Sequence, residues 1–249
     1  MNAFQAQFSK ELAKNVEPQI QKLNSDLASA STSADVVAAL DSSGLMNAPT
    51  QGLNLMGPDT ARSIGQAYSD ICSKFPFLAG NIGRANCSTY GQCLMSTGAI
   101  DFNTKYYGRG NEASFAASFS NCISTQFHPQ GVMSKGAAYA VASHELGHAI
   151  EGRLEKLMKA AGVDTTEKRK KRYFISGRVK DKVLSNLSLV DDRSVIKAEL
   201  SEYAAMDSAE FFAEAVSEYL CSPSPRPVAA EVGKILERFL KNDFSDLGI

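Results

Sequence analysis

The residues whose spacing points most directly to chemistry are two histidines four positions apart with a carboxylate beside the first. They are His144 and His148 in the stretch His-Glu-Leu-Gly-His, with Glu145 as the carboxylate. Positions i and i+4 of an α-helix share one face, so both imidazoles can bind one metal ion. Glu145 then faces the open side of the metal, where a general base takes a proton from attacking water. The spacing predicts one Zn²⁺ per chain and hydrolytic chemistry.

The neighbouring residues favour a helix around this motif. Apolar side chains recur at an approximately helical period through residues 137–161, and Gly162 is placed to end the helix. Gly147, between the two histidines, allows another segment to approach closely, although a packing glycine would look the same. The motif is therefore expected on a helix.

A catalytic zinc site needs a third protein ligand, and an acidic stripe downstream offers candidates. Residues 208–220 read as a helix with Glu210, Glu214 and Glu218 at spacings of four. Carboxylates stacked in this way repel each other by roughly a few tenths of a kcal/mol per pair, a cost that a bound cation would reverse. The alternative is an acidic face that contacts only solvent.

The two motifs together resemble a known family. Tyr203, six further residues and Glu210-Phe-Phe-Ala-Glu214, following His-Glu-x-Gly-His, resemble the zinc peptidase domain of anthrax lethal factor and its relatives in bacterial toxins and phage-encoded proteins. The resemblance covers both motifs, their order and, more weakly, residues 127–131 and the tail from Ser222.

This resemblance implies a role for each matched residue. His144, His148 and Glu210 would bind zinc, with Glu145 as the general base. The hydroxyl of Tyr203 would face the metal and stabilise the oxyanion or protonate the leaving amine. One helical turn beyond Glu210, the carboxylate at position 214 would orient a ligand histidine through its other ring nitrogen.

The resemblance also implies an α+β fold, a zincin-like catalytic domain with a small sheet, an edge strand for substrate, the His-Glu-x-x-His helix and a second helix with the glutamate ligand. Residues 75–82 and 94–102 are short, apolar and bounded by Gly, Pro and Asn, as strands are. A helix is expected over residues 60–73 and a loop over residues 103–111.

The first forty-five residues differ in composition and carry apolar side chains every three to four positions, which predicts one or two amphipathic helices. We therefore divide the chain into a helical extension and linker, residues 1–58, and the peptidase domain, residues 59–249. The extension would cap the catalytic domain, bind a partner, or act as an inhibitory or delivery element.

The stretch between the two motifs is expected to be a helical insertion, since residues 183–200 alternate apolar and charged positions. Its basic run, residues 168–172, is diluted by acidic neighbours, so a solvated helix is favoured over nucleic-acid binding.

The third histidine, His128, precedes Pro129 and is expected to fix a loop near the cleft, with metal binding as the less favoured interpretation.

Composition is that of a globular protein: 249 residues, 44% hydrophobic, net charge −1. No stretch is apolar enough for a membrane span, and no secretory signal opens the chain, so we expect cytoplasmic synthesis with virion association or delivery into a target cell as further options. The five cysteines read as reduced thiols, with a Cys87–Cys93 bridge possible if the protein is exported.

The sequence thus predicts a zinc-dependent endopeptidase with a protein or peptide substrate, associated with a phage, toxin or effector. One alternative is a phage or mobile-element protein that serves in assembly or partner binding with little or no proteolysis. Another is an effector that acts on a single host protein.

Overall fold

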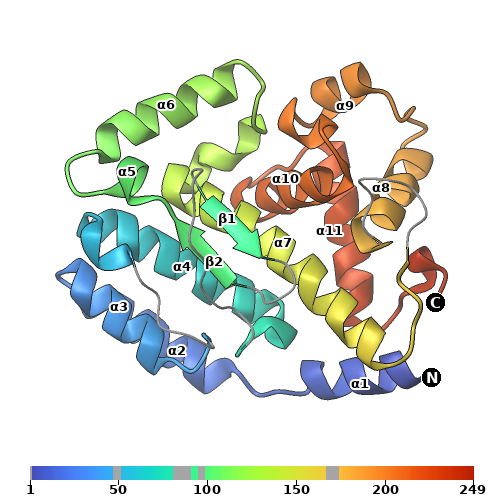
Figure 1. Ribbon diagram of the computed structural model, residues 1–249, viewed down its shortest axis with the longest axis horizontal. Helices are drawn as coiled ribbons and strands as arrows, with labels where there is room; N and C mark the ends of the chain where they lie inside the picture. Colours follow the sequence, from blue (N-terminus) through green and yellow to red (C-terminus); the bar gives the residue numbers. More distant parts are fainter. Residues whose placement is uncertain (1, 47–51, 81–90, 95–98, 167–173) are drawn as a thin grey trace.

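In the computed structural model, which describes residues 2–46, 52–80, 91–94, 99–166 and 174–249, helices make up nearly all of the regular structure. The long helix α7 (Ala137–Ala160) runs diagonally through the molecule (Figure 1). Its residues are buried on almost every side, as expected for a helix enclosed by others. The expected helix over residues 137–161 is confirmed, and it ends before Gly162, whose φ of 78° suits glycine.

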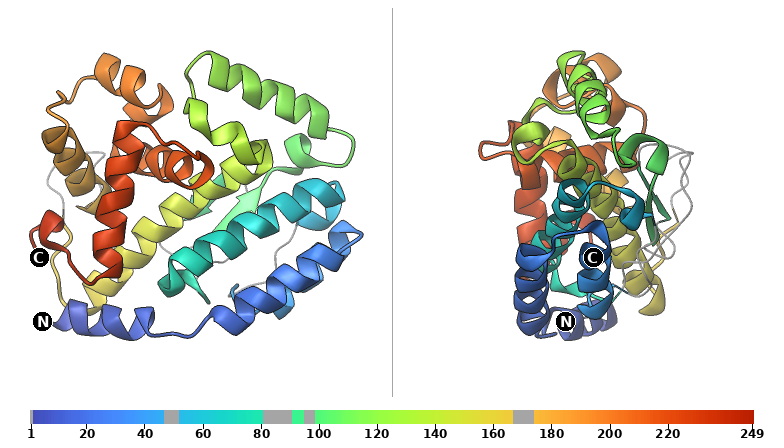
Figure 2. Two further views of the ribbon diagram at one scale, coloured as in Figure 1. Left: turned by 180° about the vertical axis from the view of Figure 1, so that it is seen from behind. Right: turned by 90° about the vertical axis from the view of Figure 1, so that its left-hand side faces the viewer.

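Two groups of helices flank α7. On one side lie α4 (Pro58–Lys74), α2 (Glu17–Ser29) and α3 (Ser33–Ser42), and on the other lie α8 (Phe174–Asn186), α10 (Ser208–Cys221) and α11 (Pro227–Leu240) (Figures 1 and 2). Helix α6 (Glu112–Ser124) and the 3₁₀ helix η3 (Gln130–Lys135) pack against α7 near its start. The arrangement places the histidine helix between two layers that shield it from water.

The expected α+β class is wrong: the fold is essentially all-α. Within the described ranges the only strands are β1 (Gly91–Leu94) and β2 (Ala99–Phe102), one antiparallel pair with Gly91 opposite Phe102. Residues 94–102 therefore contain parts of two strands rather than one. A pair this short cannot form a layer of its own and instead packs on α7.

The strand expected over residues 75–82 is also wrong where it is described. The 3₁₀ helix η2 (Pro76–Leu78) stands there, and Pro76 at its first position has no N–H to give to a sheet. Residues 60–73 are helical as predicted, within α4. The expected loop over 103–111 contains one helical turn, α5 (Thr104–Tyr107).

Three helices, not one or two, occupy the N-terminal segment: α1 (Ala3–Leu12), α2 and α3. Pro18 in the first turn of α2 cannot continue α1, and Thr32 caps α3 by accepting a hydrogen bond from the Asp35 backbone N–H. The apolar faces of these helices join one continuous core with the rest of the protein. Division of the chain at residue 58 stays a prediction.

The predicted helical insertion is present as α8 and α9 (Arg193–Glu199), followed by the 3₁₀ helix η4 (Tyr203–Ala205). The basic run at 168–172 lies outside the described residues, as does any pairing of Cys87 with Cys93. Cys72, Cys122 and Cys221 are free thiols.

The two ends of the chain lie close together (Figure 2). A hydrogen bond joins the two end segments: the Asn242 side chain donates to the Gln5 carbonyl at 3.1 Å. The 3₁₀ helix η5 (Ser245–Leu247) closes the chain. In the described ranges, no helix has the length and apolar character to cross a bilayer.

Candidate metal centre

Helix α7 places the two histidines of the motif on one face, where both are buried. Their rings meet edge to face with centroids 4.9 Å apart. Both Nε2 atoms point toward the same space, as the four-residue spacing predicts.

Helix α10 brings a carboxylate to that space. Asp207 caps α10 by accepting hydrogen bonds from the backbone N–H groups of Ala209 and Glu210, which sets the first turn. Glu210 Oε2 then lies 3.2 Å from His144 Nε2 and 3.4 Å from His148 Nε2.

These separations fit a metal ion. Two ligands of a tetrahedral Zn²⁺, each bonded at ~2.0–2.1 Å, lie about 3.3 Å apart. Glu210 Oε2 is buried and makes no hydrogen bond to the described residues. His144, His148 and Glu210 are also the one group of metal-binding side chains that the described ranges bring together, with ligand atoms all within 4.8 Å of one another. The three residues therefore form a candidate metal site.

Charges in the site are coupled. Burial opposes protonation of His144, yet the adjacent carboxylates of Glu210 and Glu214 raise its pKa well above 6.5. Burial likewise favours a neutral Glu210, but His144 and His148 outweigh it and hold the pKa of that carboxyl far below its usual range. Without a metal ion, a protonated His144 thus pairs with the ionised Glu210, and a divalent cation bound there would take the place of that proton.

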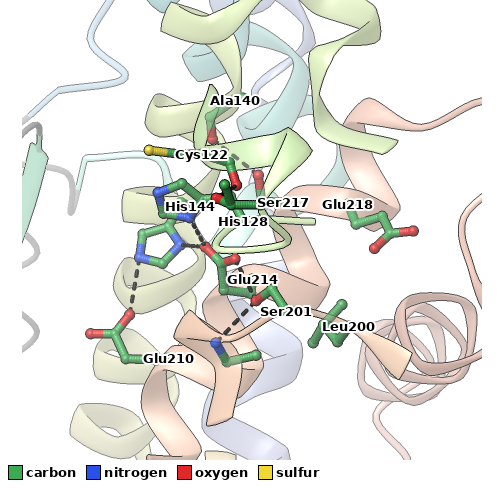
Figure 3. A network of polar contacts seen from close by, with 12 residues as sticks. Cys122, His128, Ala140, His144, Leu200, Ser201, Glu210, Glu214, Ser217 and Glu218 are labelled. Carbon is green, nitrogen blue, oxygen red and sulfur yellow. Dashed lines mark hydrogen bonds and ion pairs between the residues drawn. The ribbon is translucent and has the colours of Figure 1, made fainter. Parts of the chain in front are cut away.

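Behind His144 a second carboxylate completes a polar network (Figure 3). Glu214 Oε1 lies 2.8 Å from His144 Nδ1, an ion-pair contact, and 3.1 Å from His128 Nδ1. Its other oxygen accepts a hydrogen bond from Ser201 Oγ at 2.9 Å. Burial raises the pKa of Glu214, but His128 and His144 prevail and lower it to about 2. The carboxylate is therefore charged at neutral pH.

The third glutamate of the acidic stripe serves a different purpose. Glu218 is buried and pairs with Arg226 at 2.7 Å, and Arg226 also donates to the Leu200 carbonyl. This ion pair ties α10 to the start of α11 and contributes nothing to the metal group.

Glu145 and Tyr203 lie beside the candidate site. Glu145 is buried against β1: a Cβ atom added at Gly91 would meet Glu145 Oε1 at 2.7 Å. The Tyr203 ring lies 5.8 Å from the His144 ring between centroids. Burial and then the carboxylates of Glu210, Glu145 and Glu214 raise the tyrosine's pKa, so its hydroxyl stays protonated and can donate a hydrogen bond.

A cavity of about 410 Å³ opens next to these residues. His144, Glu145 and Tyr203 line it together with apolar side chains from α6, α7 and the segment around η3, namely Phe119, Phe127, Val132 and Val141. Phe127 is 38% exposed, whereas the other twelve phenylalanines are buried. The candidate site therefore borders a largely apolar hollow.

Sequence reasoning missed the contact of His128 with Glu214. His128 was expected to fix a loop near the cleft, and it does line the cavity, but the structure also joins it to the carboxylate behind His144. The available signal was that His128 lies within residues 127–131, the segment with the weaker match to the resembled family. In the described ranges it does not belong to the metal group.

Comparisons of the chain with protein-family models, with curated proteins and with solved structures find no match. The protein is thus defined by its own features: a mainly helical fold with a buried two-histidine, one-glutamate site of the kind a metal ion could occupy.

Proposed function

We propose that this protein is a zinc-dependent peptidase in which His144, His148 and Glu210 bind the ion. The observation that carries the proposal is the convergence of those three ligand atoms beside Glu145 and an open cavity. Two imidazoles with one carboxylate suit Zn²⁺, and three protein ligands leave a position free for water or substrate. A zinc site that only holds the fold together is usually closed by a fourth protein ligand.

The ion, when bound, would lower the pKa of a water molecule and polarise the peptide carbonyl. Glu145 receives the proton from the attacking water and passes it to the leaving amine. Tyr203, kept protonated by its surroundings, donates a hydrogen bond to the carbonyl oxygen as negative charge develops there. Glu214 holds the ring of His144 in place from behind.

A peptide is the substrate class that the surroundings favour. Strand β1 runs past Glu145, so an extended peptide could align its backbone with that strand. The apolar walls of the cavity would receive a large apolar side chain next to the scissile bond, with Phe127 at the rim.

The deciding experiment measures zinc per chain in purified, metal-repleted protein and then cleavage of a diverse peptide library, for the parent and for Glu145→Gln. One equivalent of zinc in both, with cleavage in the parent alone, is the expected result. Zinc without cleavage of any peptide in the parent would favour the assembly or partner-binding alternative. A parent without zinc would refute the proposal.

A further inference from the structure

The proposed chemistry assigns no role to His128. This histidine contacts one oxygen atom of Glu214, and the proposed metal ligand His144 contacts the same atom. Glu214 Oε1 is 3.1 Å from His128 Nδ1 and 2.8 Å from His144 Nδ1 (Figure 3). The two histidines come from neighbouring segments, the loop before η3 and helix α7, and both contact Glu214 on the more distant helix α10. One buried oxygen atom thus links them.

The protonation of this contact follows from its chemistry. An ionised carboxylate only accepts hydrogen bonds, and Glu214 Oε1 lies within hydrogen-bond distance of both ring nitrogens. With the carboxylate as acceptor, the tautomer of His128 that fits this contact carries its hydrogen on Nδ1 and donates a hydrogen bond to Glu214. His144 Nδ1 faces the same anion, which favours a proton there and leaves the Nε2 of His144 as the metal-binding atom.

The surroundings hold His128 rigidly. Its ring stacks on Phe119 with centroids 5.1 Å apart and meets Tyr203 edge to face at 5.5 Å. The His128 backbone N–H donates to the Cys122 carbonyl at 3.4 Å. Because the His128 ring cannot readily turn, its hydrogen bond can hold the Glu214 carboxylate in one orientation.

We propose that His128 is a positioning residue for the metal site, acting through Glu214 on the orientation and tautomer of His144. The inference rests on the metal site proposed above. Glu214 is 2% exposed, so water cannot readily replace a lost donor, and the carboxylate would be free to turn away from His144. Groups that orient a ligand histidine typically contribute about 10–100-fold to metal affinity.

Two amide substitutions test this inference as a matched pair. Asparagine at position 128 places its NH₂ group near the site of Nδ1, whereas glutamine places it near the site of Nε2. Both remove the ring and its stacking on Phe119. The difference between His128→Asn and His128→Gln therefore isolates the Nδ1 donor from the packing of the ring.

The measurement is zinc affinity by chelator competition, together with the visible spectrum of the Co²⁺-substituted protein, which reports ligand geometry without any substrate. We expect His128→Gln to bind zinc about 10–100-fold more weakly with an altered Co²⁺ spectrum, and His128→Asn to stay within about threefold of the parent.

Equal affinities in the parent and both variants would overturn the inference, and so would equal losses in both variants, which would assign His128 to packing. If both variants fail to fold, His128→Phe replaces them, because it keeps a ring against Phe119 and removes the Nδ1 donor to Glu214. Zinc affinity and a Co²⁺ spectrum like those of the parent would then contradict the inference, and weaker binding with a shifted spectrum would support it. A parent that binds neither zinc nor cobalt refutes the metal site itself and the inference with it.

Discussion

Gly147 on α7 lies directly against Ala213 on α10, so that a Cβ atom at Gly147 would come within 2.9 Å of the Ala213 Cα. Gly147 immediately precedes His148, and Ala213 immediately precedes Glu214. The absence of a side chain at position 147 therefore permits the close approach that brings the histidines to the carboxylates.

Gly147→Ala should push the two helices apart. The new methyl group would meet backbone, which cannot move aside as a flexible side chain can. We expect a loss of about 1–3 kcal/mol in the free energy of unfolding, measured in urea on metal-free protein, and weaker zinc binding. The double variant Gly147→Ala, Ala213→Gly should recover only part of the stability, since the contact with the Ala213 Cα remains. A single variant as stable as the parent would contradict this close contact.

Glu145→Gln should separate metal binding from turnover. The amide keeps the size of the side chain but cannot accept a proton, and residue 145 is not in the metal group. We expect one equivalent of zinc and a fall in kcat of about 10²–10⁴-fold. Glu210→Ala supplies the contrast, because it should lose zinc as well as activity. Retained turnover in Glu145→Gln would eliminate Glu145 as the base.

Tyr203→Phe removes only a hydroxyl group from the edge of the site. If that hydroxyl stabilises the transition state, kcat falls by about 10²–10³-fold while KM and zinc content change little. Steady-state kinetics on a cleaved peptide, paired with zinc analysis, provide the check. A rise in KM with unchanged kcat would instead indicate a role in substrate binding.

Glu210→Gln and Glu218→Gln form a matched pair on α10. The first should weaken zinc binding strongly, since Glu210 Oε2 faces both Nε2 atoms. The second should keep zinc but lower the free energy of unfolding by about 1–3 kcal/mol, because Glu218 is the buried partner of Arg226. Zinc analysis and urea unfolding of both variants test the assignment, and loss of zinc in Glu218→Gln alone would reverse it.

The pH dependence of stability should include a contribution from Glu11, which joins α1 to α7. Glu11 Oε2 lies 2.7 Å from Arg153 Nη2. Burial raises the pKa of Glu11, but its contacts with Lys14 and Arg153 give a net lowering from 4.5. Because the folded-state pKa is the lower one, the stabilisation is complete above the unfolded-state pKa and is lost as pH falls through the folded-state value.

Glu11→Gln should therefore be less stable than the parent at pH 7, by about 0.5–1 kcal/mol for this partly exposed pair. The two proteins should converge in acid. Urea unfolding of both metal-free proteins, from pH 7 into acid, measures the difference in their free energies of unfolding. A difference that grows as the pH falls would contradict a lowered pKa of Glu11 in the folded protein.

Much of the site could be predicted because its signals are local. A four-residue spacing places His144 and His148 on one helical face whatever the rest of the fold does, and the neighbouring apolar period correctly predicted α7 and α10. The strand prediction over residues 75–82 failed because short apolar runs between turn residues suit 3₁₀ turns as well as strands, and Pro76 favoured the turn.

The three glutamates of the acidic stripe show what could not be predicted from the sequence, namely which distant residues each one contacts. By itself the sequence determined that Glu210, Glu214 and Glu218 would share a helical face, and that two imidazoles would lie together on another helix. Only the tertiary structure decided that Glu210 faces both Nε2 atoms, that Glu214 lies between His128 and His144, and that Glu218 pairs with Arg226. The reason is physical: helical periodicity is set by backbone hydrogen bonds within one segment, whereas the rotation of one helix against another is set by contacts between distant segments, such as Gly147 on Ala213.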